Sequence, residues 1–368
     1  VVVGDGEHDL SASFTDPAGN QSARSAPLPV NLDTTAPDAP VGANLIDGNG
    51  KSLSGGDGLT NNGDLVMSGS GAAPGDVVKI WDGESLIGSS IVGPDGSWRV
   101  PVVVVGDGDH NLSASFTDPA GNESAKSAPI AVDLDTTAPG APAAGSLTDG
   151  NSQDLSHGGL TNSGEMNMSG TGGTAGDTVN LYDGDTLIGT ATVGTDGSWT
   201  LPAEISGDRV HDLSTSYTDP AGNESARSAP IAVDLDTTAP DAPAAGSLID
   251  GNAQDLSAGG LTNSPDMNMS GSGGTAGDTV NLYDGDTLIG SATVGVDGSW
   301  TIPAELAGDR THELTTSYTD PAGNESAKSA PIAVDLDTTP PDAPAAGSLT
   351  DGNSQDLSHG GLTNSGEM

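Results

Sequence analysis

The chain contains 368 residues, with 52 Asp or Glu against 9 Lys or Arg, and its formal net charge is −43. Nucleic acids and anionic lipids are bound through clusters of Lys and Arg, so this composition excludes both as partners. There is no cysteine, which excludes disulfides, thiolate zinc sites and a cysteine nucleophile, and no apolar run approaches the roughly 18 residues of a membrane helix. The many carboxylates favour a hard cation such as calcium as partner.

The sequence repeats itself along its length. The motif Asp-Thr-Thr begins at Asp33 and returns after 102, 101 and 101 residues, at Asp135, Asp236 and Asp337. We divide the chain into the tail of one repeat at 1–37, complete repeats at 38–139, 140–240 and 241–341, and the head of another at 342–368. Neither end coincides with a repeat boundary, so we expect a longer parent array.

Alternating apolar and polar residues predict strands within each repeat. In 140–240 the predicted strands are, in chain order, 143–148, 165–171, 177–182, 187–194, 198–203, 211–218 and 225–235. Turn sequences such as Asp183-Gly184 and Asp196-Gly197 separate them, and no helical periodicity is present. An all-β, seven-stranded antiparallel sandwich of the immunoglobulin-like kind fits this pattern. Its expected core comprises Leu181, Val193, Trp199, Tyr217, Ile231 and Val233.

The connection between repeats is short and contains proline. The linker Asp-Thr-Thr-Ala-Pro at 236–240 is followed by Pro243. Proline fixes the backbone angle φ and stiffens the chain, in contrast to a flexible Gly/Ser tether. We therefore expect an elongated array, a monomeric rod in which neighbouring repeats of the chain are partners of one another.

Several short motifs occur in one order within the repeat. They are Leu-Thr-Asn (261–263), Met-Ser-Gly (269–271), Ala-Gly-Asp-Thr-Val (276–280), Asp-Gly (284–285), Ile-Gly (289–290), Asp-Gly-Ser-Trp (297–300), Asp-Pro-Ala-Gly-Asn (320–324) and Asp-Thr-Thr-Pro-Pro (337–341). The ordered set resembles the bacterial Ig-like repeats of giant Gram-negative surface adhesins, which are biofilm-associated, RTX-adhesin-like and exported by type I secretion. The similarity covers essentially the whole chain.

This resemblance implies a function. It describes a structural extender, or stalk, at the extracellular face of a bacterial cell, whose joints are stiffened by calcium. Such a stalk projects a distal adhesive domain, which would lie outside this segment, for attachment to cells or surfaces and for biofilm formation.

Topology predicts where calcium would bind. In an immunoglobulin-like sandwich the last strand runs away from the loop before it, so the Asp-Pro-Ala-Gly-Asn loop should face the linker arriving from the previous repeat. Calcium takes roughly six to eight oxygen ligands from carboxylates, amides and carbonyls. The predicted ligands lie in the linkers, in that loop and in the loop before the third strand: Asp33, Asp118, Asn122, Asp133, Asp135, Asp177, Asp219, Asn223, Asp234, Asp236, Asp278, Asp320 and Asn324.

The same Asp and Asn residues are also typical of Asx turns in which glycine supplies a positive φ, and both roles can hold at once. A second acidic stretch contains Asp149, Asn151 and Asp154. It lacks the spacing of an EF-hand, and we interpret it as a long solvated loop.

We expect no enzymatic activity. A histidine recurs near the start of the sixth strand, without a nucleophile elbow, and is interpreted as a surface side chain; the copies are His8, His110, His211 and His312. The motif Asp-Gly-Ser-Trp is interpreted as a turn followed by a core tryptophan rather than as a sugar-stacking platform.

Two other functions remain open. The Ig-like modules could themselves bind a host receptor or a glycan, which requires an exposed aromatic or apolar patch. Trp81, Tyr182 and Tyr283 are the candidates, because their phase is opposite to that of the inward residues of their strand. Alternatively, the repeats could be the accessory stalk of a secreted polysaccharide-degrading enzyme whose catalytic domain lies outside this segment.

Overall fold

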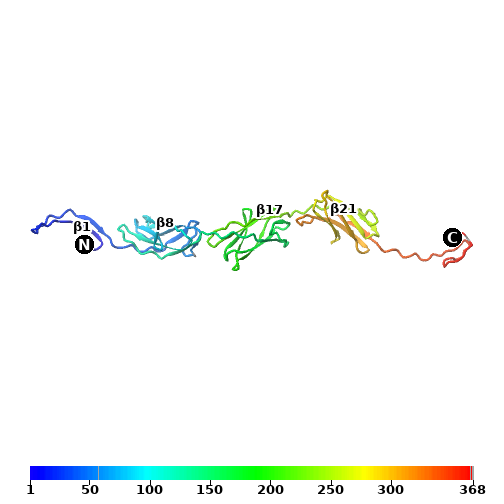
Figure 1. The fold of residues 1–368 in the computed structure, drawn as a ribbon, viewed down its shortest axis with the longest axis horizontal. Helices are drawn as coiled ribbons and strands as arrows, with labels where there is room; N and C mark the ends of the chain where they lie inside the picture. Colours follow the sequence, from blue (N-terminus) through cyan, green and yellow to red (C-terminus); the bar gives the residue numbers. More distant parts are fainter. Residues whose placement is uncertain (57, 365, 367–368) are drawn as a thin grey trace. The chain divides into compact units, whose positions relative to one another are not determined.

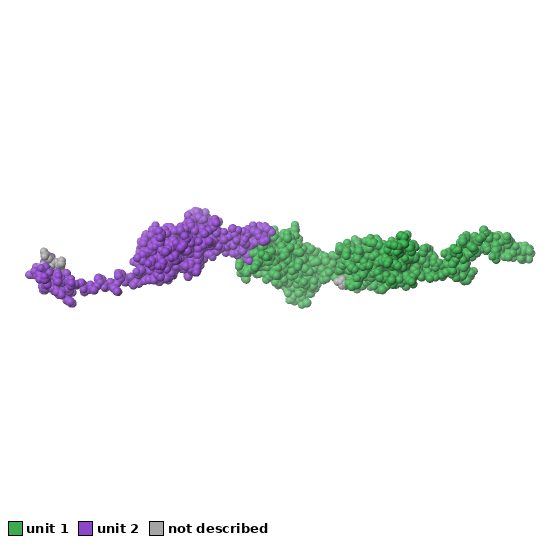
Figure 2. Space-filling view, turned by 180° about the vertical axis from the view of Figure 1, so that it is seen from behind, with its two compact units in different colours: residues 1–159, 164–205, 210–233 green, residues 160–163, 206–209, 234–368 purple. Residues whose placement is uncertain are grey.

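The computed structural model describes residues 1–56, 58–364 and 366. Over these residues the secondary structure consists of strands and turns, without a helix (Figure 1), so the predicted all-β class is confirmed. The described part of the chain contains no helix with the length and apolarity needed to cross a membrane. Two compact units are distinguished in Figure 2: residues 1–159, 164–205 and 210–233, and residues 160–163, 206–209 and 234–368.

The strands recur in the same order from repeat to repeat. In residues 1–37 they are β1 (Gly6–Leu10) and β2 (Leu28–Leu32). In 38–139 they are β3 (Asn44–Asp47), β4 (Leu59–Thr60), β5 (Asp64–Ser70), β6 (Val77–Asp82), β7 (Ser85–Ile91), β8 (Ser97–Val103), β9 (Gly108–Thr117) and β10 (Ile130–Leu134). In 140–240 they are β11 (Ser146–Asp149), β12 (Gly159–Thr161), β13 (Glu165–Thr171), β14 (Thr178–Asp183), β15 (Thr186–Thr192), β16 (Ser198–Glu204), β17 (Arg209–Thr218) and β18 (Ile231–Leu235). In 241–341 they are β19 (Ser247–Asp250), β20 (Gly260–Thr262), β21 (Asp266–Ser272), β22 (Thr279–Asp284), β23 (Thr287–Thr293), β24 (Ser299–Glu305), β25 (Arg310–Thr319) and β26 (Ile332–Leu336).

Each complete repeat contains a three-stranded and a five-stranded sheet. The orders are β3-β5-β8 with β4-β10-β9-β6-β7, then β11-β13-β16 with β12-β18-β17-β14-β15, and finally β19-β21-β24 with β20-β26-β25-β22-β23. Most neighbouring strands are antiparallel, but β4 runs parallel to β10, and β20 runs parallel to β26 with Leu261 opposite Asp335. The start of each repeat is therefore shared between the two sheets.

The structure corrects the predicted strand count. Eight strands, rather than seven, are described in 140–240, because the short β12 was not predicted. Alternation cannot reveal a strand of this length, since only its pairing with a strand far along the sequence identifies it. The predicted strand 225–235 is also too long, because β18 begins at Ile231. Before it, the hydroxyls of Ser225 and Ser228 accept hydrogen bonds from the amides of Tyr217 (2.9 Å) and Thr215 (3.0 Å).

The core of each repeat is built from both sheets. The residues predicted for the core of 140–240 are all 5% exposed or less, which confirms that prediction. The tryptophans of the three Asp-Gly-Ser-Trp motifs are each 4% exposed, so they are core residues as expected. In 140–240 the Trp199 indole donates a hydrogen bond to the Tyr217 hydroxyl at 2.9 Å, whereas in 38–139 Trp98 meets Phe116 edge-on.

Candidate functional site at the linkers

A carboxylate from the preceding repeat holds each Asp-Thr-Thr linker. Asp107, in the turn before β9, accepts hydrogen bonds from the Thr136 amide (3.0 Å) and hydroxyl (2.7 Å) through Oδ1, and from the Thr137 hydroxyl (2.6 Å) through Oδ2. These hydroxyl and amide donors lower the pKa of Asp107, with the Thr137 hydroxyl as the largest cause. We call this arrangement the carboxylate clamp.

The clamp occurs at every described linker. Its other copies are Asp5 with Thr34 and Thr35, Asp208 with Thr237 and Thr238, and Asp309 with Thr338 and Thr339. Sequence reasoning did not select these aspartates. The signal was present, because an Asp after a glycine recurs 29 residues before the first Thr of each linker, but the same composition is typical of an ordinary turn.

The Asp-Pro-Ala-Gly-Asn segment forms a closed turn, which we call the junction loop. Asp118 accepts a hydrogen bond from the Asn122 amide at 2.8 Å and from the Asn122 side chain at 2.9 Å, and Gly121 has φ +96°. The Asn122 side-chain donor is the largest cause that lowers the pKa of Asp118. The Asx turn predicted for these residues is therefore present in the structure.

The junction loop also reaches the linker of the previous repeat. The Asn122 side-chain amide donates to the Asp33 carbonyl oxygen at 3.0 Å, and Asn223 donates to the Asp135 carbonyl oxygen at 2.8 Å. Asn324 and Asp236 form the third copy, at 2.8 Å. The approach of loop and linker expected from the sandwich topology is thus present at the three linkers that precede a complete repeat.

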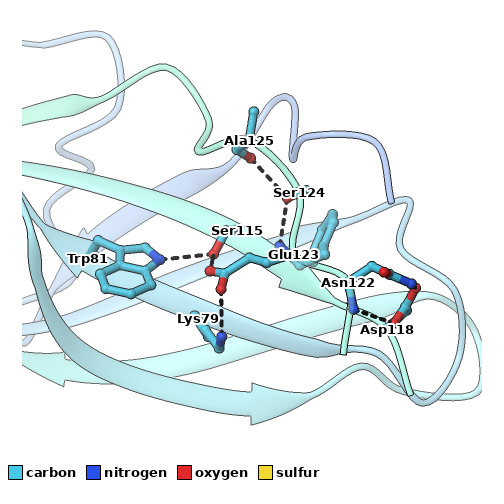
Figure 3. A network of polar contacts seen from close by, with 9 residues as sticks. Lys79, Trp81, Ser115, Asp118, Asn122, Glu123, Ser124 and Ala125 are labelled. Atoms are coloured by element: carbon cyan, nitrogen blue, oxygen red, sulfur yellow. Dashed lines mark hydrogen bonds and ion pairs between the residues drawn. The ribbon is translucent and has the colours of Figure 1, made fainter. Parts of the chain in front are cut away.

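The residue after the junction-loop asparagine anchors this loop to its own sheet. Figure 3 shows Glu123 accepting a hydrogen bond from the Ser115 hydroxyl (2.7 Å) and pairing with the Lys79 ammonium (2.8 Å), beside the bonded Asp118 and Asn122. The Lys79 side chain lowers the pKa of Glu123, followed by the Ser115 hydroxyl. The loop that meets the linker is therefore anchored to β6 and β9 through the hydrogen bond and the ion pair of Glu123.

Carboxylates line a cavity beside the first linker. The cavity measures about 520 Å³ and includes Asp33, Asp38, Asp76 and Asp118 among its lining residues. Asp76 is 3% exposed, and its carboxylate accepts a hydrogen bond from the Ala73 amide at 3.2 Å. These oxygen donors have the chemistry that calcium prefers. However, no three His, Cys, Asp or Glu side chains in the described part of the chain are grouped as a metal site.

The remaining predicted ligands fall into three groups. Asp177 and Asp278, the counterparts of Asp76, are 2% and 3% exposed and accept hydrogen bonds from the amides of Thr174 (3.3 Å) and Thr275 (3.2 Å). Asp133 and Asp234 instead point outward from β10 and β18. Among the described residues, no hydrogen bond joins either of these two side chains to the next repeat. Asp219 and Asp320 close their junction loops as Asp118 does.

The second acidic stretch differs from the expected solvated loop at its first residue. Asp149 is 5% exposed, and its Oδ1 accepts hydrogen bonds from the amides of Asn151 (2.9 Å) and Gln153 (2.8 Å). The interpretation was therefore wrong for Asp149, because the carboxylate is needed inside the repeat to close the turn. Asn151 and Asp154 are exposed, as expected.

The aromatic side chains that were candidates for receptor or glycan binding each contact a Lys or Arg side chain of their own repeat. Lys126 lies 4.6 Å from the Trp81 ring centroid, Arg227 3.8 Å from the Tyr182 ring and Lys328 4.2 Å from the Tyr283 ring. The rings are half-buried rather than exposed. Such intramolecular cation–π pairs compete with a ligand for the aromatic face.

The recurring histidines are not all surface side chains. His211 and His312 are 0% exposed, so that expectation was wrong for them. Their Nδ1 atoms lie 2.8 Å from carboxylate oxygens of Asp183 and Asp284. The strand start that looked exposed in sequence is buried, and the carboxylate at the end of the neighbouring strand contacts the edge of the ring.

Two packed sheets with antiparallel neighbours, a first strand divided between the sheets and a buried tryptophan define an immunoglobulin-like β-sandwich. The chain belongs to the family of bacterial Ig-like domains, whose model matches residues 39–136, 140–237 and 245–338. These tandem domains carry the linker contacts described above.

Solved structures with detectable similarity include several bacterial proteins. One is a Ca²⁺-stabilized adhesin that helps an Antarctic bacterium reach out and bind ice (21% identity, 90% of this chain and 82% of that chain, TM-score 0.34). Another is a 1.5-MDa bacterial ice-binding adhesin (20% identity, 82% and 100%, TM-score 0.27). A third is the BSP domain of a biofilm-associated protein (14% identity, 77% and 65%, TM-score 0.20). No curated protein matches the chain.

Proposed function

We propose that this chain is a stalk segment of a large bacterial cell-surface adhesin. Its tandem domains would extend from the cell and project a distal adhesive domain for attachment and biofilm formation. The observation that carries the proposal is that one linker is bonded on both sides. Asp107 of the preceding repeat holds Thr136 and Thr137, while Asn223 of the following repeat donates to the Asp135 carbonyl.

Such a linker has little freedom to act as a hinge. Proline at 139 and 142 restricts the backbone beside these contacts. The hydrogen bonds connect repeats through main-chain atoms of the linker, so bending the joint requires breaking them. A receptor-binding module would need no such connection, and its aromatic candidates already have intramolecular partners.

Calcium is the second part of the proposal. Asp33, Asp76 and Asp118 come from the linker and from two loops of the next repeat, and all three line one cavity. Their mutual repulsion opposes a closed joint, and a bound divalent cation would remove it. At about ten times its dissociation constant, an ion adds roughly 1.4 kcal/mol to stability at each site by mass action.

Spin labels test both parts on the full chain. Because the protein has no cysteine, S85C and T186C place two labels at matching exposed positions of consecutive repeats. We expect a narrow distance distribution with calcium and a broader one with EDTA, together with a lower melting temperature in EDTA. A broad distribution in both buffers would overturn the stiff joint. A narrow distribution and an unchanged melting temperature in both would overturn the calcium part alone.

A further inference from the structure

His110 connects the carboxylate clamp to the end of a neighbouring strand. Its Nδ1 lies 2.7 Å from Asp82 Oδ2, and its Nε2 lies 2.9 Å from the carbonyl oxygen of Gly106. Gly106 directly precedes Asp107, whose carboxylate holds Thr136 and Thr137 of the linker. The imidazole therefore fixes the turn that carries the clamp.

The two contacts define the charge of the ring. An ionised carboxylate and a backbone carbonyl can only accept hydrogen bonds, so the ring satisfies both oxygens only as imidazolium, with both nitrogens donating. A neutral ring keeps one N–H and turns a lone pair toward the other oxygen. The charge-assisted contact with Asp82 is the stronger of the two. Loss of the proton therefore removes the hydrogen bond to the Gly106 carbonyl and loosens the turn that carries Asp107.

The same connection occurs in other copies. His312 lies 2.8 Å from Asp284 and 3.1 Å from the Gly308 carbonyl oxygen, and Gly308 precedes the clamp residue Asp309. His8 lies 2.8 Å from the Gly4 carbonyl oxygen, next to Asp5. The contact between an imidazole and the residue before a clamp aspartate therefore recurs in three copies of the repeat.

The charges around His110 favour its protonated form. Asp82 ends β6, and Asp109 lies beside the histidine on β9, while β10 places the apolar Val132 opposite it. At His312, Arg310 pairs with the same carboxylate that contacts the imidazole, so that carboxylate has two partners. The first complete repeat, which has Gly108 at the corresponding position, therefore offers the simplest test.

We propose that His110 is a proton-dependent switch of its linker, which holds the carboxylate clamp when protonated and loosens it when neutral. The inference rests on the proposed role of the linker as a stiff joint. It adds a regulation by pH that does not involve calcium, because the imidazole touches the clamp turn rather than the acidic cavity.

The hydrogen bond from the imidazole to Asp82 is the largest cause that raises the pKa of His110 above 6.5. A group whose pKa is raised by folding contributes its full stabilisation below its unfolded pKa and loses it as the pH rises through the folded pKa. The switch is therefore closed in mildly acidic solution and opens on the alkaline side of the ordinary histidine range.

Amide hydrogen exchange of the full chain tests the switch at Thr136, whose N–H is bonded to Asp107. After correction for intrinsic exchange, we expect the protection of Thr136 to fall roughly tenfold as the pH rises from 5.5 to 9, as for the loss of one charge-assisted hydrogen bond. H110Q should abolish this pH dependence, because glutamine does not titrate. D82N should move the transition to lower pH, and the Cε1 proton resonance of His110 should titrate over the same range.

The control is H157Q, which changes an exposed histidine and should keep the pH dependence of the unaltered chain. Protection of Thr136 that is independent of pH, or that keeps its pH dependence in H110Q, would overturn the switch. The series is run with EDTA and again with calcium. A spin-label distribution that does not respond to calcium would contradict the calcium part of the proposed function and leave the histidine result intact.

Discussion

The side-chain amide of Asn223 donates a hydrogen bond to the backbone carbonyl of Asp135, which lies 88 residues earlier, at 2.8 Å. The same amide group donates to Asp219 Oδ2, also at 2.8 Å, so both of its hydrogens are used. A residue that closes its own loop therefore also binds the linker of the repeat before it. This pairing makes the position of the linker depend on the integrity of the junction loop.

Replacing this amide should loosen the joint without unfolding the repeat. In N223D a carboxylate faces the Asp135 carbonyl and the Asp219 carboxylate, so two attractive contacts become repulsive at neutral pH. We expect the distance distribution between labels at S85C and T186C to broaden. The matched control is N268D, which makes the same change at an exposed strand position. An equally narrow distribution in N223D would show that this bond does not restrain the linker.

The clamp should fail in acid. Hydrogen bonds from Thr137 and Thr136 hold the pKa of Asp107 below 3.8. A carboxylate whose pKa is lowered by folding stabilises the folded state above its unfolded pKa and loses that contribution as the pH falls through the folded pKa. We therefore expect the corrected hydrogen-exchange protection of Thr136 to fall below about pH 4.

D107N is the matching variant for this prediction, because its amide cannot follow the titration and its Nδ2 cannot accept from Thr137. It should weaken protection of the linker at every pH and remove the acid transition. D196N changes another turn aspartate with a lowered pKa and should leave Thr136 unaffected. Acid loss of protection that persists in D107N would assign the transition to another carboxylate.

Removing the buried carboxylate of the next repeat that corresponds to Asp76 of the acidic cavity should weaken the response to calcium. Asp177 is 2% exposed, and the hydrogen bond that its carboxylate accepts from the Thr174 amide is long, at 3.3 Å. The D177N substitution removes the charge of this side chain with little change in its size. If calcium binds there, the variant should need more of it to reach the same melting temperature. D196N again provides the exposed control, and calorimetry in a calcium series gives the measurement. An identical calcium series for D177N would exclude Asp177 as a ligand.

The buried tryptophans of two repeats differ in one hydrogen bond, so the contribution of that bond to stability can be measured. Trp199 donates to the Tyr217 hydroxyl, while Trp98 Nε1 is buried without a partner, because Phe116 has no hydroxyl. Y217F should destabilise 140–240 by about 1–3 kcal/mol, the cost of leaving a buried donor unpaired. Urea-dependent hydrogen exchange in β16 and β8 would measure the two repeats separately.

The effect of the reverse substitution, F116Y, depends on the space beside the ring. A Cβ at Gly173 would lie 3.1 Å from the Tyr217 ring, and the corresponding residue of the first complete repeat is Ala72. We therefore expect F116Y alone to gain little, whereas F116Y with A72G should be more stable than the sum of the single changes predicts. Additive effects would show that the ring and the small residue are independent.

The sequence determined the local and periodic features of this protein. Repetition established tandem organisation, alternation located most strands and the buried tryptophans, and the Asp, Gly and Asn of the junction loop predicted a turn. These features depend on residues that are near neighbours in the chain or that share one face of a strand. The short β12 was not predicted, because it is a strand by virtue of its pairing with β18 rather than by its own sequence pattern.

Which polar side chains meet depends on how the chain folds in three dimensions. In a chain with 52 acidic residues, composition cannot distinguish Asp107, which holds a linker 29 residues later, from Asp133, which points outward. The same holds for His211 and His312, which are buried and contact the carboxylate that ends a neighbouring strand. Hydrogen bonds act over a few ångströms in space, and the fold alone brings distant parts of the sequence within that range.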